Sequence, residues 1–193
     1  MTLLILGLLL FLGIHSVSIV APGWRDAQAL RLGVLPWKAI YSVISLVGFV
    51  LLVMGYSAAR QSPVVLYTPP IFMRHLAALL MLPVFPLLIA AYLPGRIQAA
   101  VKHPMLLAVK FWALAHLLAN GTLADVLLFG GFLGWAIADR ISVKRRQLRP
   151  VPGAAASAAN DLIAVIGGLL VYGLFVWRAH VWLFGVAPFG SMP

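Results

Sequence analysis

Charged residues are scarce in this chain, and cysteine is absent. Of its 193 residues only 9% are charged, whereas 63% are hydrophobic. A soluble domain carries about 25% charged and about 45–50% apolar residues. The chain cannot cover itself with charge, so we predict an all-α integral membrane protein. We expect a single domain over residues 1–193, because no long polar linker divides the sequence.

The missing residue types also limit the chemistry. Without cysteine there is no disulfide, no thiolate nucleophile and no thiolate metal ligand. Glutamate is absent as well, and the four acidic residues all lie near the ends of apolar segments. These are Asp26, Asp125, Asp139 and Asp161. A paired-carboxylate mechanism and a carboxylate metal cluster are therefore disfavoured.

Six apolar segments predict a bundle of six transmembrane helices. A helical span needs about 20 residues, because about 30 Å of hydrocarbon is crossed at 1.5 Å per residue. Pro83 and Pro86 predict a kink in the third segment, and Gly130, Gly131 and Gly134 predict close approach of another helix to the fifth. Five spans, with the last segment lying in the interface, is the competing count. The predicted spans are 2–20, 39–56, 75–92, 105–118, 123–138 and 162–177.

The positive charge is distributed as expected for a multi-pass membrane protein. The formal net charge is +10, and most basic residues lie in the first, third and fifth connections. The positive-inside rule places these connections in the cytoplasm and the N-terminus in the periplasm. Basic residues between apolar segments indicate membrane topology and contact with the lipid bilayer, so nucleic acid is disfavoured as a partner.

Histidine is the remaining reactive residue type. His15 and His116 lie inside predicted spans, His75 and His103 lie at the start of spans, and His180 follows the last span. An intramembrane histidine commonly hydrogen-bonds a neighbouring helix. Paired imidazoles from different helices can also hold haem b. In the predicted topology His15 and His103 lie at similar depths in the membrane, and so do His75 and His116. Depth alone therefore favours these two pairs.

Seven short motifs lie along nearly the whole chain. They are FLGIHS (11–16), WKAIYS (37–42), GYSAAR (55–60), PPIFMRH (69–75), HPM (103–105), WALAHLLANG (112–121) and LFG (128–130). With these motifs the chain resembles the NnrU family of bacterial inner-membrane proteins, which extends to the zeta-carotene isomerases of plants and cyanobacteria. The resemblance implies a multi-pass inner-membrane protein linked to denitrification and to nitrite and nitric oxide reductase function.

The isomerase branch of the family adds expectations about a cofactor. It implies haem b with histidine ligands and a redox-controlled cis-to-trans isomerisation of a carotenoid. His103-Pro104 and His116 match that branch's His-Pro and Ala-His elements, and His15 matches its first-span histidine. The resemblance therefore implies His15 and His116 as axial ligands of the haem iron. Ala113 stands where the isomerase branch has a cysteine, so a ligand switch to thiolate is excluded.

These observations favour one functional hypothesis over two others. We expect an NnrU-type protein that binds haem b through histidines and supports nitrite and nitric oxide reduction. The cofactor-binding candidates are His15, His116, His103 and His75. One alternative is a haem-dependent cis-trans isomerase of a carotenoid-like lipid, which would bind a hydrophobic small molecule. The other is a non-enzymatic assembly or transport factor that recruits reductase components.

Overall fold

The computed structural model describes residues 1–146 and 153–189. This part of the chain is helical, and its one isolated β-bridge joins Val65 and Thr122. The helices form two compact units. Unit 1 comprises Met1–Tyr67 and Gly121–Leu148, and unit 2 comprises Thr68–Asn120 and Arg149–Pro193. Arg149, the last residue of the basic run that begins at Lys144, lies outside the described residues.

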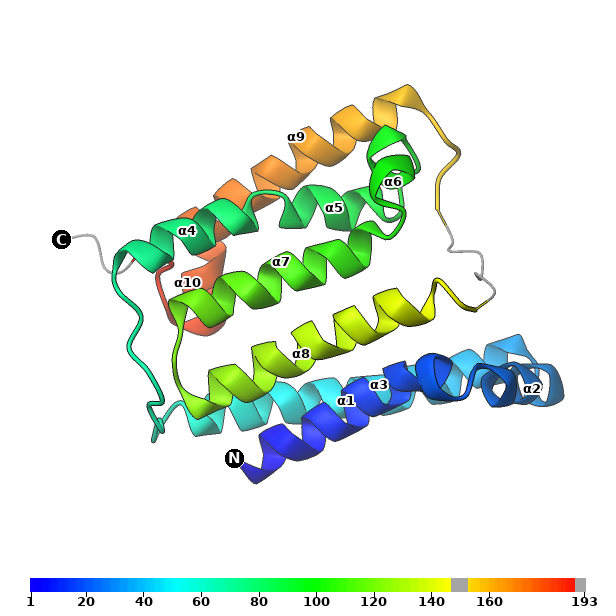
Figure 1. Cartoon of the computed structure of the whole chain (residues 1–193), viewed down its shortest axis with the longest axis horizontal. Coiled ribbons are helices and arrows are strands. Elements are labelled where there is room, and N and C mark those ends of the chain that lie inside the picture. Colours follow the sequence, from blue (N-terminus) through cyan, green and yellow to red (C-terminus); the bar gives the residue numbers. More distant parts are fainter. Residues whose placement is uncertain (147–152, 190–193) are drawn as a thin grey trace. The chain divides into compact units, whose positions relative to one another are not determined.

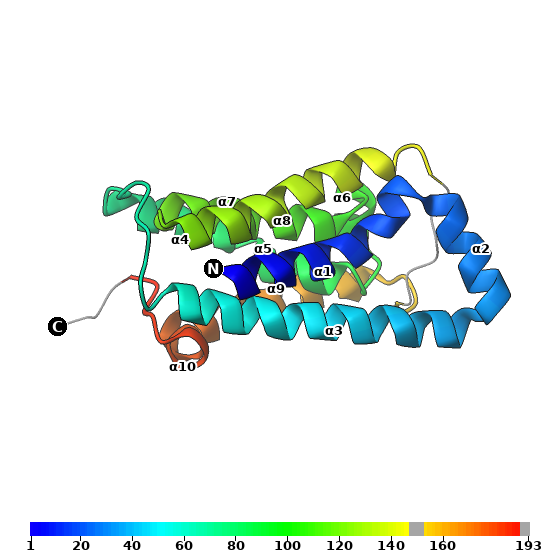
Figure 2. The same ribbon diagram turned by 90° about the horizontal axis from the view of Figure 1, so that it is seen from below.

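Unit 1 is built on two helices that are adjacent in sequence. Figure 2 shows α1 running alongside α3, with α2 joining them at one end. The fourth helix, α8, packs mainly on α1. The helices are α1 (Thr2–Val20), α2 (Pro22–Leu32), α3 (Val34–Ala59) and α8 (Leu123–Ser142).

Glycines allow the backbones of α1 and α3 to meet. A Cβ atom on Gly7 would lie 2.5 Å from the backbone nitrogen of Leu52, and one on Gly48 would lie 2.7 Å from that of Phe11. A Cβ atom on Gly55 would collide with the backbone of Leu4, which is fully buried. Small residues permit this kind of close helix approach in a membrane, where lipid tails provide no hydrophobic driving force between helices.

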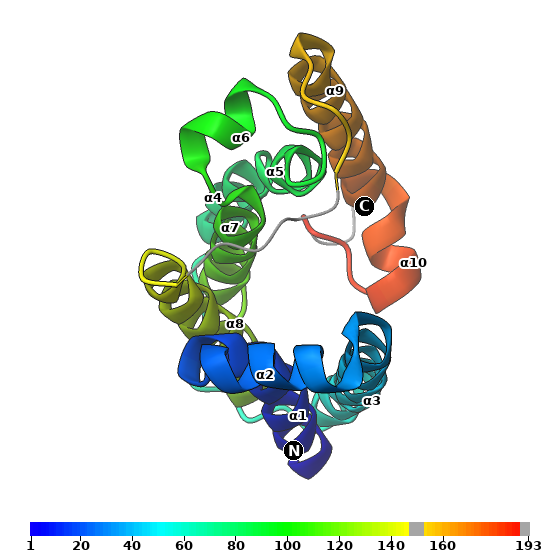
Figure 3. The same cartoon turned by 90° about the vertical axis from the view of Figure 1, so that its right-hand side faces the viewer.

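Unit 2 contains the remaining helices. Figure 3 shows α5 between α7 and α9, and α4 also packs on α7. The helix that begins with α9 continues through a five-residue π-helix, η1, into α10. The elements are α4 (Phe72–Met81), α5 (Val84–Ala90), α6 (Arg96–Val101), α7 (Pro104–Ala119), α9 (Ala158–Leu174), η1 (Phe175–Ala179) and α10 (His180–Phe184).

Each of the six predicted spans falls on a helix or a helical segment. Among the described residues, four segments are long and apolar enough to cross a membrane, and α7 is a shorter apolar helix. The predicted kink is confirmed, because α4 ends at Met81 and α5 begins at Val84. The count of six spans stays a prediction. The four longer segments are Thr2–Val20, Val34–Ala59, Phe72–Ala90 and Ala158–Phe184.

Two details differ from the sequence-based expectations. The first and third connections contain helices α2 and α6, which the short polar stretches did not indicate. The expected close approach to α8 is wrong at Gly130 and Gly134, where an added Cβ atom would meet no atom within 4 Å. At Gly131 an added Cβ atom would make only ordinary contacts with two leucine side chains of α1.

Candidate histidine sites

His15 lies in an aromatic environment in unit 1. Its ring stacks on Phe11 with a centroid separation of 4.3 Å, and it makes edge contacts with Tyr41 of α3 and Trp135 of α8. Nδ1 of His15 lies 2.6 Å from the backbone carbonyl of Phe11, one turn earlier on α1. A carbonyl can only accept, so Nδ1 carries the proton and Nε2 carries the lone pair.

Two of the other histidines lie close together in unit 2. The ring centroids of His116 and His180 are 6.5 Å apart, and the ring planes differ by 20°. Nδ1 of His116 lies 2.8 Å from the carbonyl of Trp112, and Nδ1 of His180 lies 2.6 Å from the carbonyl of Val186. Both imidazoles therefore hold their proton on Nδ1 and their lone pair on Nε2.

The backbone around His180 sets the orientation of its ring. The π-helix η1 ends at Ala179, immediately before His180. Gly185 ends α10 in the left-handed conformation, with φ 70° and ψ 15°. Glycine adopts this conformation without a steric penalty. The turn brings the chain back so that the carbonyl of Val186 reaches His180.

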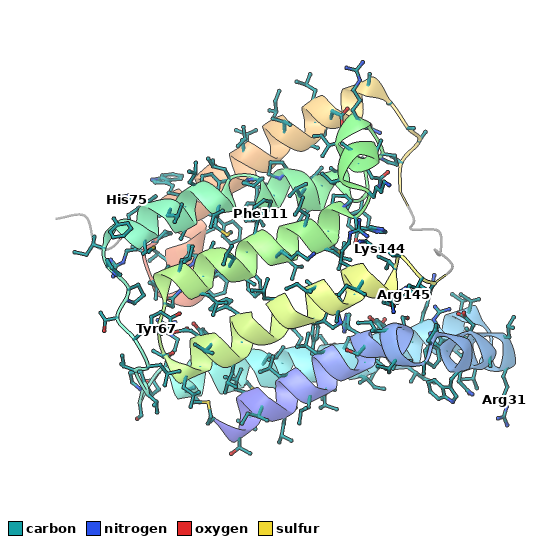
Figure 4. The ribbon with its side chains drawn as sticks, in the orientation of Figure 1. Arg31, Tyr67, His75, Phe111, Lys144 and Arg145 are labelled. Carbon is teal, nitrogen blue, oxygen red and sulfur yellow. The ribbon has the colours of Figure 1, made fainter. Side chains whose placement is uncertain are left out.

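The two remaining histidines lie at the beginning of α4 and of α7. His75, labelled in Figure 4 on the first turns of α4, stacks on Phe189 at a centroid separation of 5.9 Å. His103 caps α7 and follows Lys102, whose φ of 63° is positive. The His103 N–H donates to the carbonyl of Val101 at 2.7 Å, which closes a γ-turn of the rare, strained type. His103 therefore marks the tight connection between α6 and α7.

The aspartates have structural partners near helix ends. Asp125 accepts hydrogen bonds from Thr122 and Tyr56, and Asp139 pairs with Arg146 at 2.8 Å. Asp161 accepts the first two N–H groups of α6. Burial raises the pKa of the nearby Tyr67, and the Asp125 carboxylate acts in the same direction. These contacts leave the histidines as the candidate reactive groups.

The grouping of these side chains limits the kind of metal they can hold. In the described part of the chain, no three histidine or carboxylate side chains gather around one point. A bare metal ion usually needs at least three protein ligands. Haem needs fewer, because the porphyrin supplies four nitrogens and the protein supplies only axial ligands. A neutral imidazole with its Nδ1–H bound to a carbonyl has the donor chemistry of such a ligand.

In the described residues, the helical fold with four segments long and apolar enough to cross a bilayer indicates an integral membrane protein, and its histidines are the candidate reactive side chains. The chain belongs to the NnrU family, since the family model described as NnrU protein matches residues 3–188. A search of the curated proteins and a search of the solved structures found no match.

Sequence reasoning identified the histidines but did not pair them as unit 2 does. His15 belongs to unit 1, and the other four histidines belong to unit 2. The pairing of His15 with His116 stays a prediction, as does each assignment to a cofactor. His180 was missed as a partner of His116, because it follows the last predicted span and no motif includes it. Ala113 is fully buried in α7, three residues before His116.

Proposed function

We propose that this protein binds haem b through histidine side chains. The observation that best supports the proposal is that three imidazoles make the same kind of hydrogen bond. His15, His116 and His180 each direct Nδ1–H to a backbone carbonyl. Iron-ligating histidines usually donate their other ring nitrogen in this way, which fixes the tautomer and makes Nε2 more basic.

His116 is the first ligand in this proposal. It lies in the last turns of an apolar helix, where a polar side chain is retained at a free-energy cost. The family pattern gives His15 as the second axial ligand, and His75 and His103 are further candidates. When bound, haem b would supply one-electron redox chemistry. Backbone carbonyls would fix the histidine tautomers, with Phe11 beside His15 in unit 1 and Trp112 beside His116 in unit 2.

Family membership supports a proposal for the biological setting. We propose a multi-pass protein of the bacterial inner membrane, with six spans and a periplasmic N-terminus, that supports nitrite and nitric oxide reduction in denitrification. The described apolar helices support a lipid environment. Reductase components are the proposed partners.

Gene deletion with complementation tests this role in a denitrifying host. The deletion should reduce nitrite and nitric oxide consumption, and the wild-type gene should restore it. His116→Ala should fail to restore consumption, whereas the control Trp182→Phe should succeed, because Trp182 is 83% exposed. Full restoration by His116→Ala would contradict the haem role and would favour a non-enzymatic assembly factor. No effect of the deletion would contradict the role in denitrification.

A further inference from the structure

Helix α2 lies across one end of unit 1. Figure 3 shows it reaching from the end of α1 to the start of α3, and both of these helices are long and apolar enough to cross a membrane. The chain turns from α2 into α3 at Gly33, whose φ of 89° favours glycine. The buried Trp37 of α3 holds α2, with its ring centre 5.9 Å from that of Trp24 and 5.8 Å from the guanidinium carbon of Arg25. A helix held across the ends of two such segments lies along the membrane surface.

The last turns of α8 lie at the same end of unit 1. Trp135 of α8 contacts His15 near the end of α1, with 5.9 Å between the ring centres. Figure 4 labels Lys144 and Arg145, which follow α8, and Arg31, which lies in the last turn of α2, at this end. Basic residues from two distant parts of the sequence therefore share one end of the unit.

This end of unit 1 is strongly basic. Residues 20–42 and 135–146 together contain seven basic and two acidic residues. Both acidic residues, Asp26 and Asp139, already form ion pairs with arginines. Four basic side chains at this end are exposed, and we call them the basic surface: Arg31, Lys38, Lys144 and Arg145. In the described part of the chain the basic surface takes no part in these two ion pairs, so its charge is available to an anionic partner.

Apolar side chains are exposed beside the basic surface. Leu30 is 87% exposed and Leu35 is 78% exposed, one on each side of Gly33. Contact with water disfavours both side chains, whereas lipid acyl chains would cover them. Helices that lie in the plane of a membrane combine exposed apolar side chains with lysine and arginine, which are attracted to anionic lipids.

We propose that α2 and the basic surface form a binding surface for anionic phospholipids, which anchors this end of unit 1 to the membrane. The basic surface binds lipid phosphates, and Leu30 and Leu35 insert among the acyl chains. An acidic protein or a free phosphate ion would match the charge but would not supply acyl chains for the two leucines. In the proposed topology this end faces the cytoplasm, where the leaflet is anionic. The inference does not require haem and is independent of the proposed function.

Native mass spectrometry of the full chain in detergent, titrated with phosphatidylglycerol or with phosphatidylcholine, tests the proposal. A basic residue near an anionic membrane surface contributes about fivefold in affinity, so the wild type should prefer phosphatidylglycerol by about 25-fold or more. The double variant Arg31→Gln/Lys38→Gln should lose about 25-fold in affinity for phosphatidylglycerol and little for phosphatidylcholine. Arg60→Gln is the matched control and should bind as the wild type does, because Arg60 is exposed and follows the opposite end of α3.

The other outcomes overturn the proposal. Equal affinity of the wild type for the two lipids, or an unchanged preference in the double variant, removes the anionic lipid as the partner. Displacement of phosphatidylglycerol by an equal concentration of glycerol 3-phosphate assigns the surface to a free anion, and tighter binding of a polyglutamate peptide assigns it to an acidic protein. Circular dichroism checks folding. If the double variant does not fold, Lys144→Gln/Arg145→Gln, which alters residues beyond the end of α8, decides the question by the same comparison.

Discussion

Replacing Asp125 by alanine should destabilise unit 1 without removing a reactive group. Asp125 is 4% exposed and accepts hydrogen bonds from Tyr56 Oη at 2.6 Å and from the Thr122 backbone N–H at 2.9 Å. Thr122 and Asp125 form a capping box at the start of α8, and the alanine variant loses the side-chain half of it, which contributes about 1 kcal/mol. It also leaves the half-buried Tyr56 hydroxyl without its acceptor, which costs about 1–3 kcal/mol. The free energy of unfolding should fall by about 2–4 kcal/mol in total.

Thermal unfolding of the detergent-purified protein, followed by circular dichroism, measures this effect. At about 2–4 °C per kcal/mol for a chain of this size, the melting temperature should fall by about 5–15 °C. Asp26→Ala is the matched control. Asp26 pairs with the adjacent Arg25 and its side chain is 52% exposed, so its removal should cost at most about 1 kcal/mol. Equal melting temperatures for Asp125→Ala and the wild type would refute the structural role of Asp125.

Two further predictions concern the backbone. Gly55→Ala should destabilise the protein by about 1–3 kcal/mol, because its Cβ atom would collide with α1. Gly134→Ala should stabilise it by about 0.5–1 kcal/mol, because Gly134 meets no atom within 4 Å and alanine favours a helix. Melting temperatures that shift in the same direction for both variants would contradict the helix packing. Lys102→Gly should raise the free energy of unfolding by about 1 kcal/mol, because lysine is strained at φ 63°. A lower melting temperature for this variant would show that the γ-turn is not strained.

The helical architecture follows from composition because one physical constraint dominates it. Apolar residues that must cross hydrocarbon have to satisfy their backbone hydrogen bonds internally, which favours helices. The prolines between Leu82 and Leu87 also indicated the break that separates α4 from α5. Helix α2 was harder to predict, because contacts with α3 stabilise it. Trp24 packs on Trp37 of α3, and Arg25 lies 5.8 Å from the centre of the Trp37 ring.

The glycines also show that tertiary contacts are hard to predict from the sequence. Three glycines close together in α8 suggested a contact surface, yet the close backbone approaches between helices occur at other glycines. These are Gly7, Gly48 and Gly55 between α1 and α3, and Gly168 between α9 and α5. Spacing along one helix does not reveal which face a partner covers. Only the pairing of helices, such as α1 with α3 and α5 with α9, distinguishes the glycines that meet a backbone from those that do not.

The sequence could not show how the histidines lie relative to one another, for a similar reason. Residue type and membrane cost identified His15 and His116, and the family motifs supported both. The contact between His116 and His180 depends on the π-helix of η1 and on the turn at Gly185, and neither has a signal in hydrophobic periodicity. From the sequence alone, His180 is therefore read as a residue at the membrane boundary, because it follows the last predicted span.

Haem titration of the wild-type protein tests the central claim most directly. The full chain, purified in detergent without cofactor, would be titrated with haem b and its absorption spectrum recorded in the oxidised and reduced states. Histidine ligation predicts saturation at one haem per chain, a low-spin spectrum, and loss of that spectrum in His116→Ala. A titration with no saturable change in the haem spectrum, or an identical spectrum in His116→Ala, would contradict the account.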